Sequence, residues 1–333
     1  GRALGRPSRL AENAGTAYNG CYLLGMGFVV EPEEAGEWID ADARNADVLL
    51  AFLNGEDLNS RPDTSPSRWV IDFTGKDEAV AAHYEVPFER VRAKVRMERL
   101  AKPEAVAKAP WWQFFRPRGE LRSAMADLDE VLVIALVSKT VMPMRVPTGQ
   151  VFSHALGVFA TDSFGDQAVL SSSLHQTWAI KYGSGMRNDP RYTPSDVFET
   201  FPRPDPSPDL ERIGRVLDEE RREIMLRRDL GLTKLYNLVN DPTLPDAADA
   251  DAARMRAIHR ELDEIVVEAY GWGDVPLDHG FHTYRQMTRW TVSPAARVEI
   301  LDRLLEENHR RAALQGGAPP AAEDDSDDTG GDE

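Results

Sequence analysis

The stretch Lys181-Tyr-Gly-Ser-Gly-Met-Arg187 places cationic and hydroxyl side chains between glycines. Glycine lets a backbone approach a ligand closely, and Lys and Arg can donate to guanine O6 and N7 in the major groove of DNA. The stretch is therefore a candidate base-reading loop. The same residues also suit an ordinary surface loop, and their chemistry alone leaves both alternatives open.

A second candidate is the segment 90–122, which carries ten Lys and Arg residues against three Glu. Such a cluster can attract DNA phosphates whatever the base sequence. Within it, Trp111-Trp-Gln-Phe-Phe-Arg-Pro-Arg118 sets aromatic rings beside two arginines. We expect the aromatic rings to fill a core and the arginines to face DNA. The candidate phosphate contacts are Arg90, Arg92, Lys94, Arg96, Arg116 and Arg118.

The formal net charge of −17 argues against a nucleic-acid-binding protein until it is placed along the chain. After Gln315 the chain turns to Gly, Ala and Pro and then holds seven acidic residues, so we expect a disordered tail over 315–333. Charge is thus segregated along the sequence, and one face of the protein can still attract phosphate.

Patterns typical of catalysis are weak. Gly25-Met-Gly27 followed by Glu31 resembles a nucleotide-binding loop, but it leads into the apolar Phe28-Val-Val30, which favours a turn between extended segments. The chain has no Asn-Pro-Pro-Tyr tetrad of amino-methyltransferases. It also has no Lys preceded two positions earlier by Asp or Glu, the spacing by which common nucleases hold a metal and water. We expect no catalytic residues in this chain.

Two further groups have simpler alternatives. Ser171-Ser-Ser173 and His175 lack the Gly-x-Ser-x-Gly elbow of a hydrolase, which favours a polar loop. His279 and His282 could share a metal if they lay on a helix, but the surrounding Gly and Pro favour a loop with surface or interface histidines. We therefore expect no metal site.

The elements that must position these residues change in character along the chain. Apolar and β-branched runs predict strands at 27–30, 69–72, 131–137 and 157–160. Helical character is found at 33–53 and 77–100, and 119–127 predicts a short helix. The first part is therefore expected to be an α/β or α+β domain.

Four prolines within 202–208 favour an extended connection, and we place a domain boundary there. Beyond it we expect a helix with Asp209 as N-cap that ends at Gly231, a second helix over 255–269, and a third with Ser293 as N-cap. This part is expected to be a small all-helical domain.

Composition limits the class of protein. With 333 residues, 42% of them hydrophobic, the chain can bury a sizeable core. Its single cysteine, Cys21, excludes an internal disulfide framework and favours a reducing, cytoplasmic compartment. No apolar run is long enough to span a membrane. Because the sequence begins at Gly1, we interpret it as an internal fragment of a longer protein.

Several strings, read in order, resemble the C-terminal half of MmeI-like (type IIL) restriction-modification proteins and related large adenine-N6 methyltransferases. The resemblance covers about 18–311 and depends on the order of the strings rather than on any one of them. The strings are Gly25-Met-Gly-Phe28, Phe52-Leu-Asn-Gly-Glu-Asp-Leu58, Arg68-Trp-Val-Ile-Asp-Phe73, Trp111-Trp112, Ser172-Ser-Leu-His175 with Trp178, Arg191-Tyr-Thr-Pro-Ser195, Phe198-Glu-Thr-Phe-Pro202, Gly231-Leu-Thr-Lys-Leu-Tyr-Asn237 and Ala269-Tyr-Gly-Trp272.

The resemblance implies a DNA target recognition domain at 18–204, after a fragment start or linker at 1–17, and a helical C-terminal domain at 205–314. In such proteins a nuclease and an S-adenosylmethionine-dependent methyltransferase domain precede these parts, and neither is matched here. Their base-reading residues lie toward the end of the recognition domain. The candidates in that region are Lys181, Ser184, Met186 and Arg187, with Arg187 first.

We therefore expect this chain to recognise double-stranded DNA for an adenine-N6 methyltransferase of a bacterial restriction-modification or phage-defence system. S-adenosylmethionine is implied only for the methyltransferase domain or subunit, and no cofactor is expected in this chain. Two alternatives stay open: a separate specificity subunit acting in trans, and a protein-interaction module of a phage-defence system that no longer reads DNA.

Overall fold

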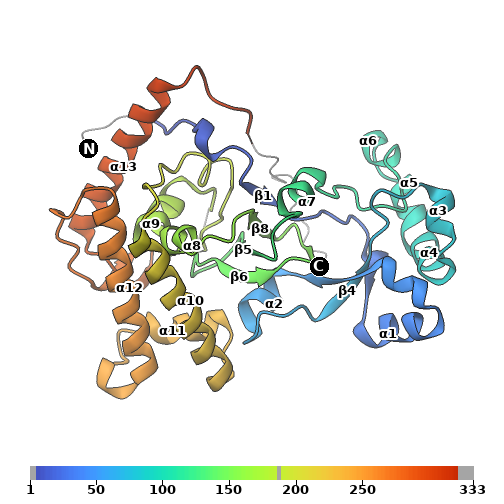
Figure 1. Ribbon diagram of the computed structural model, residues 1–333, viewed down its shortest axis with the longest axis horizontal. Helices are drawn as coiled ribbons and strands as arrows, with labels where there is room; N and C mark the ends of the chain where they lie inside the picture. Colours follow the sequence, from blue (N-terminus) through green and yellow to red (C-terminus); the bar gives the residue numbers. More distant parts are fainter. Residues whose placement is uncertain (1–4, 186–188, 322–333) are drawn as a thin grey trace.

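The computed structural model describes residues 5–185 and 189–321 (Figure 1). Its central sheet has the strand order β1-β8-β5-β6, and all neighbouring strands are antiparallel. The apolar run predicted as a strand forms β5 (Glu130–Ala135), and every residue after Glu130 is buried. A strand buried on both faces is near-continuously hydrophobic, which explains the run. The other strands are β1 (Ala17–Asn19), β6 (Met144–Pro147) and β8 (Leu156–Phe159).

A second sheet has the order β2-β4-β3-β7. The strand β3 (Leu49–Leu53) pairs antiparallel with β4 (Arg68–Ile71) and parallel with β7 (Val151–Phe152), while β2 (Val29–Val30) lies at the edge. The prediction of helix over 33–53 is therefore wrong for its last five residues. The helix α1 (Pro32–Ala41) ends earlier, and a 3₁₀ turn leads into β3.

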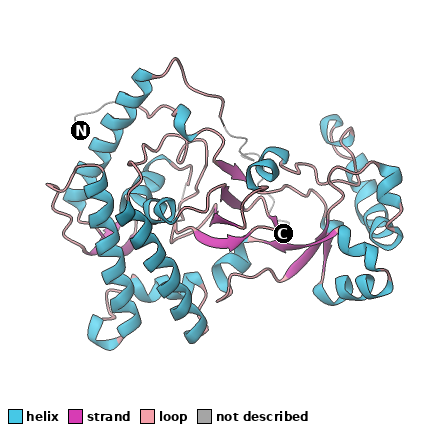
Figure 2. Ribbon diagram, viewed as in Figure 1, coloured by secondary structure: helices cyan, strands magenta, loops and turns pink. Residues whose placement is uncertain are grey.

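Short helices cover this second sheet and form the lobe on the right of Figures 1 and 2. Most of the expected helix at 77–100 is found, interrupted by a π-helical turn at Arg92–Arg96. The lobe has a hydrophobic core of its own, which includes Phe28, Phe73 and Val95. The helices that follow α1 in the lobe are α3 (Glu78–Ala82), α4 (Glu85–Val91), α5 (Met97–Leu100) and α6 (Glu104–Ala107). By contrast, α2 (Gly55–Ser60) and α7 (Gly119–Met125) contribute Leu58 and Leu121 to the core around the central sheet.

Long helices form the opposite end of the molecule, at the left of Figure 1. The helix predicted to begin at Asp209 instead has Ser207 as its N-cap, whose hydroxyl accepts from the backbone N–H of Leu210. It ends at Arg228 rather than Gly231, and Gly231 precedes the next helix. The helices are α8 (Phe164–Leu170), α9 (Ser173–Tyr182), α10 (Pro208–Arg228), α11 (Leu232–Val239), α12 (Ala250–Ala269) and α13 (Pro294–Leu314).

The C-terminal part is not all helical, which corrects the sequence prediction. The strands β9 (Gly280–Tyr284) and β10 (Met287–Thr291) form an antiparallel hairpin between α12 and α13. The expected N-cap of α13 is confirmed, since the Ser293 hydroxyl accepts from the Ala296 N–H. The C-terminal part is thus a helical assembly that carries one two-stranded ribbon.

One hydrophobic core joins the central sheet to the long helices. It includes Val133 on β5, Trp178 on α9, Leu217 on α10 and Ile258 on α12, each fully buried. The buried indole of Trp178 also donates to the Thr200 hydroxyl, 3.1 Å away. The helix α9 is therefore held between the sheet and the C-terminal helices.

Gly25 and Gly27 allow the backbone before β2 to pack closely against the π-helical turn at Arg92–Arg96. A Cβ on Gly27 would lie 2.6 Å from Cβ of Lys94 and 2.7 Å from a methyl group of Val95. Such distances require a shift of the π-helical turn. By contrast, Gly36 on α1 is exposed, and an added Cβ would meet nothing within 4 Å.

These two glycines predict opposite effects of the same substitution. Gly27→Ala overpacks the lobe and should lower the free energy of unfolding by about 1 to 3 kcal/mol. Gly36→Ala should raise it by about 0.5 to 1 kcal/mol, because alanine loses less entropy in a helix. Urea unfolding of both variants checks this, and equal midpoints for the two would contradict the packing described.

Candidate nucleic-acid interface

The predicted base-reading stretch begins on α9 and leaves it at the helix end. Lys181 is exposed in the last turn of α9, and Ser184 is exposed just beyond it. Met186 and Arg187 lie outside the described residues. The described part of the stretch therefore presents one cation and one hydroxyl at the surface, on a helix whose preceding residues are buried.

The described residues on either side of 186–188 meet in a narrow neck. The Ser184 N–H donates to the Arg191 carbonyl at 3.2 Å, and Arg191 forms a β-bridge with Val137 beyond β5. A Cβ on Gly183 would lie 2.3 Å from the Arg191 oxygen, and one on Gly185 would lie 2.8 Å from the Arg191 nitrogen. The glycines thus allow the backbones to approach, and the loop leaves from a fixed base.

A buried imidazole holds the neck in place through Tyr192, the residue that follows Arg191. His175 on α9 contacts the Leu170 carbonyl through Nδ1 and the Tyr192 hydroxyl through Nε2, both at 2.8 Å. Because a carbonyl only accepts, Nδ1 carries the proton and Tyr192 donates to Nε2. Burial raises the pKa of Tyr192 well above its usual value, so its hydroxyl keeps that proton. Sequence reasoning missed Tyr192, although it lies in one of the strings that carry the resemblance.

The serines beside His175 do not form the polar loop that the sequence favours. They lie at the junction of α8 and α9 and are buried. The Ser172 hydroxyl caps α9 by accepting from the His175 N–H. The backbone N–H and hydroxyl of Ser173 donate to the two oxygens of Asp263, at 2.8 and 2.6 Å. These residues position α9.

Asp263 also receives a third hydrogen bond. His279 contacts one of its oxygens through Nε2 at 2.7 Å, and both side chains are almost fully buried. The Thr291 hydroxyl on β10 donates to the Ser173 hydroxyl at 3.2 Å. His282 lies on β9, apart from this pair. Within the ranges that the structure describes, no group of three His, Cys, Asp or Glu residues could hold a metal ion.

The six predicted phosphate contacts fall into three groups: one buried arginine, two paired arginines and three exposed cations. Arg118 is buried, with 9% of its surface exposed, and its Nε donates to the Gly20 carbonyl at 2.9 Å. It supports the backbone, and its burial makes it the least accessible of the six predicted phosphate contacts. Arg90 pairs with Glu34 and lies over Trp38, and Arg92 pairs with Glu89. These two are engaged at the surface of the lobe.

The remaining three candidates, Lys94, Arg96 and Arg116, are exposed. The Arg96 guanidinium lies over the Trp111 ring, and that of Arg116 lies over Phe115. The rings of Trp111 and Phe114 are buried in the lobe, as expected for aromatics that fill a core. The aromatic residues therefore hold exposed guanidinium groups in place on this face of the lobe.

Another arginine of the basic segment has a purely structural position. Arg99 is 1% exposed and donates to the carbonyls of Leu23, Leu24 and Gln113 at 2.7–2.8 Å. Its burial lowers the pKa of the guanidinium to about 10. Sequence charge counts therefore overstate the cationic surface of this segment.

The residues around Gly25 and Gly27 do not fit a nucleotide cofactor. Both glycines face Val95 at contact distance, and Gly27 also faces Lys94. The backbone after them forms a 3₁₀ turn, Met26–Phe28, that leads into β2 rather than into a helix. No helix N-terminus is available at this turn to bind a phosphate or an adenosyl group.

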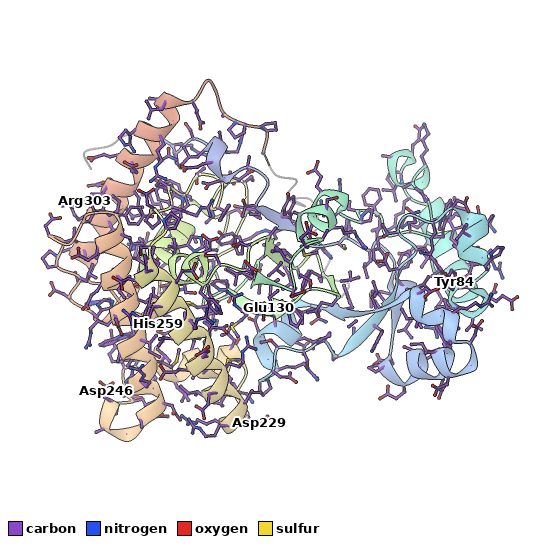
Figure 3. The ribbon with its side chains drawn as sticks, viewed as in Figure 1. Tyr84, Glu130, Asp229, Asp246, His259 and Arg303 are labelled. Carbon is purple, nitrogen blue, oxygen red and sulfur yellow. The ribbon has the colours of Figure 1, made fainter. Side chains whose placement is uncertain are left out.

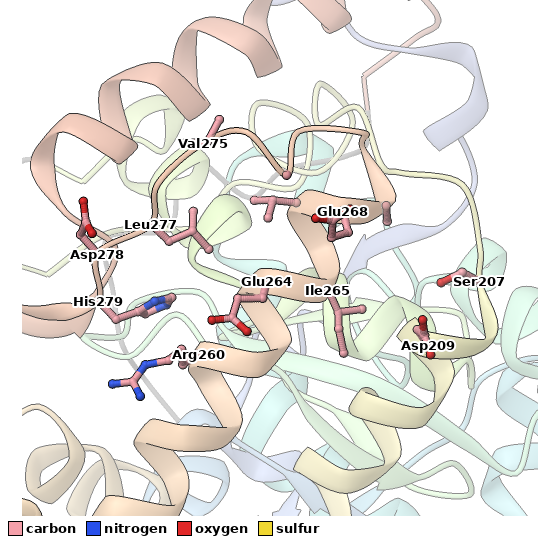
Figure 4. Close-up of a pocket in the computed structure, with 13 residues that line it drawn as sticks. Ser207, Asp209, Arg260, Glu264, Ile265, Glu268, Val275, Leu277, Asp278 and His279 are labelled. Carbon is pink, nitrogen blue, oxygen red and sulfur yellow. The ribbon is translucent and has the colours of Figure 1, made fainter.

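A large cavity lies on the helical end of the molecule (Figure 4). It measures about 860 Å³ and lies between α12, the start of α10 and the segment before β9. Its charged lining residues are Asp209, Glu264, Glu268 and Asp278 with Arg260 and His279. Four carboxylates against one arginine disfavour DNA phosphates, so this cavity is not the nucleic-acid interface.

Comparison with known proteins agrees with this geometry. A family model described as MmeI, target recognition domain, matches residues 20–205. The chain is a target recognition protein. It belongs to the MmeI target recognition domain family, and the matched residues include the loop neck. No curated protein matches the chain.

The fold also resembles a solved structure, that of the type IIL restriction-modification enzyme MmeI in complex with DNA. The TM-score is 0.62 at 18% sequence identity, which shows a shared fold. The match covers 90% of this chain but 36% of the MmeI chain, so this protein spans about a third of its relative. No helix of the described residues is both long and apolar enough to cross a membrane.

The buried imidazole predicts a pH-dependent stability. Burial lowers the pKa of His175 to about 4, whereas the pKa of a histidine in an unfolded chain is about 6.5. The folded state holds the neutral ring, so its contribution is complete above about pH 6.5 and is lost as pH falls toward 4. His259, buried on α12, has a pKa lowered to about 4 in the same way and adds to the loss (Figure 3).

NMR titration of the imidazole Cε1 signals separates the two rings. We expect the His175 ring to stay neutral until near pH 4, while urea unfolding shows a falling free energy between pH 6.5 and 4. A His175 signal that titrates near 6.5 would be inconsistent with the buried hydrogen bonds to Leu170 and Tyr192.

Proposed function

We propose that this chain recognises a specific double-stranded DNA sequence for an S-adenosylmethionine-dependent adenine-N6 methyltransferase of a restriction-modification or phage-defence system. The observation that carries the proposal is the family match over 20–205, which contains a glycine-rich loop on a rigid neck. The structural relative was solved in complex with DNA. Loops held by a rigid scaffold are common sites of recognition.

The proposed work is divided between two surfaces. Exposed Lys94, Arg96 and Arg116 on the lobe bind backbone phosphates and position the duplex. The loop that begins at Lys181 and Ser184 reads base edges, with Arg187 as the first candidate for a bidentate contact to guanine. Affinity for any DNA and preference for one sequence then depend on different residues.

Methyl transfer belongs to a partner domain or subunit in this proposal. The Gly25–Gly27 pattern that resembles a cofactor loop is instead packed against Lys94 and Val95. The helical end carries an acidic surface, including the cavity lined by Glu264 and Glu268, which suits contact with a protein rather than with DNA. We place the methyltransferase contact at that end.

Selection from a pool of random duplexes tests the proposed function. Repeated binding to the purified chain and sequencing of the retained DNA should enrich one short sequence, which a non-specific binder does not enrich. An unchanged pool after several rounds would reject sequence recognition and favour a protein-interaction module.

Two arginine variants should separate base reading from phosphate binding. Loss of the proposed Arg187 contact should weaken binding to the selected duplex by about 1 to 3 kcal/mol and leave a scrambled duplex almost unaffected. Arg96→Ala should weaken both duplexes and reduce the magnitude of the salt slope by about 0.9. Fluorescence anisotropy over a NaCl series measures both effects.

Arg227→Ala is a matched control, because Arg227 on α10 is paired with Glu223 and Asp251 at the helical end. It should change neither the affinity nor the salt slope. Equal losses on selected and scrambled DNA for Arg187→Ala would remove Arg187 as a base reader.

A further inference from the structure

We infer that the β9–β10 hairpin is a second DNA-contacting element, which binds backbone phosphates beside the base-reading loop. The inference rests on the proposed function and extends it to a part of the chain outside the 20–205 match. Three observations support it: the conformation of the hairpin turn, its hydrogen bonds to the segments of the neck, and a cluster of cations without ion-pair partners among the described residues.

The hairpin has an unusual tip. Tyr284 and Met287 are its last paired residues, so the two-residue turn consists of Arg285 and Gln286. Both have positive φ, 50° and 65°, and both are exposed. Turns of this kind strongly favour Asn and Gly, because other residues are strained in the left-handed region. Strained positions of this sort concentrate at functional sites, here with an arginine at the tip.

Two hydrogen bonds attach the hairpin to the segments that form the loop neck. Arg285 Nη1 donates to the carbonyl of Ile180, near the end of α9, at 3.0 Å. Arg289 Nη2 donates to the carbonyl of Lys139, beyond β5, at 3.1 Å. The hairpin and the base of the loop that starts at Lys181 are therefore neighbours with a fixed geometry.

The attachment gathers cations from four segments. Lys139, Lys181, Arg285, Arg289 and Arg297 lie on or beside these contacts, and Arg289 lines small cavities together with Arg285 and Arg297. Within the part of the chain that the structure describes, none of the five has a carboxylate within ion-pair distance. Tyr284 packs between two of them, with the guanidinium carbons of Arg297 and Arg285 3.1 and 5.4 Å from its ring centre.

Arginines at the helical end differ from this cluster because they form ion pairs with carboxylates. Arg254 pairs with Glu220 there, and Arg303 on α13 pairs with Asp274 and Glu299 (Figure 3). Arg212 and Arg227 are paired with acidic residues in the same way. In an acidic protein, a cluster of five described cations with no carboxylate in ion-pair contact is a local exception to the charge pattern, although the Asp189 charge acts on Arg289 from a greater distance.

Arg289 is the clearest sign that an anion belongs here. It is 5% exposed, and its Nε has no hydrogen-bond partner. Burial and the nearby charge of Arg297 lower the pKa of its guanidinium to about 10, although the charge of Asp189 opposes the shift. An incompletely satisfied buried cation is costly, and an approaching phosphate at the rim of the cluster lowers that cost.

The geometry favours duplex DNA as the source of that phosphate. A two-stranded ribbon is narrow enough to enter the major groove, and guanidinium groups form paired hydrogen bonds with phosphate oxygens. With the hairpin tip and the loop neck adjacent, one stretch of duplex can contact both. The hairpin then adds affinity without adding base preference.

Two substitutions test the inference in the full chain. Lys139→Gln removes a charge but keeps the backbone carbonyl that anchors Arg289, so the fold should be unaffected. Arg285→Gln removes the charge at the tip. We expect each to weaken binding about five- to tenfold at 0.1 M salt, on the selected and on a scrambled duplex alike, and to reduce the salt slope by about 0.9.

Arg254→Gln, on a paired and exposed arginine of α12, is the matched control and should bind as the unaltered chain does. Unchanged affinity and slope for both Lys139→Gln and Arg285→Gln would overturn the inference while leaving the proposed function in place. A loss confined to the selected duplex would also overturn it, because phosphate contacts do not depend on sequence. Failure of the unaltered chain to bind any duplex would instead reject the proposed function itself.

Discussion

The buried carboxylate of Asp263 is the interaction on which the arrangement of the interface depends. It lies on α12, is 1% exposed, and accepts hydrogen bonds from Ser173 and His279. A buried carboxylate without these donors would carry a large desolvation cost. Separating α12 from α9 or from the segment that holds His279 therefore requires a large free energy. Its negative charge also faces the first turn of α9, where the helix dipole favours an anion. One side chain thus joins the recognition domain to the helical end.

This connection explains how the loop proposed to read bases can begin at the end of a short helix. The helix α9 is fixed at its start by Asp263, in its middle by buried Trp178 and His175, and at its end by Arg285 of the hairpin. A reading loop needs its base held to within a fraction of an ångström, because a base contact depends on the placement of two hydrogen bonds at once. The C-terminal helices therefore contribute to recognition through the position of the loop.

The sequence predicted the main helices from the helical period of their apolar residues, and β5 from a continuous apolar run that is buried on both faces. The prediction failed where pairing with a strand distant in the sequence determines the local structure. Leu49–Leu53 continues a helical stretch in apolar character, and only its pairing with β4 and the distant β7 makes it a strand. The β9–β10 hairpin has the aromatic and β-branched residues of a ribbon, but its Arg-Gln turn lacks the Asn and Gly that mark one. A sequence pattern cannot show contacts made across the fold.

The cationic surface of the candidate site could likewise be predicted only in part from the sequence. A run of basic residues predicted a cationic surface, yet Arg99 and Arg118 are buried and hold backbone carbonyls in place. The cluster around the hairpin was not apparent, because its members are far apart in the sequence and the net charge is −17. That acidity is itself compatible with the proposed recognition. In the proposed function, carboxylates at the helical end repel a duplex and so favour its approach to the cations beside the loop. A small cationic surface also limits binding to random DNA, and specificity depends on the ratio of the two affinities.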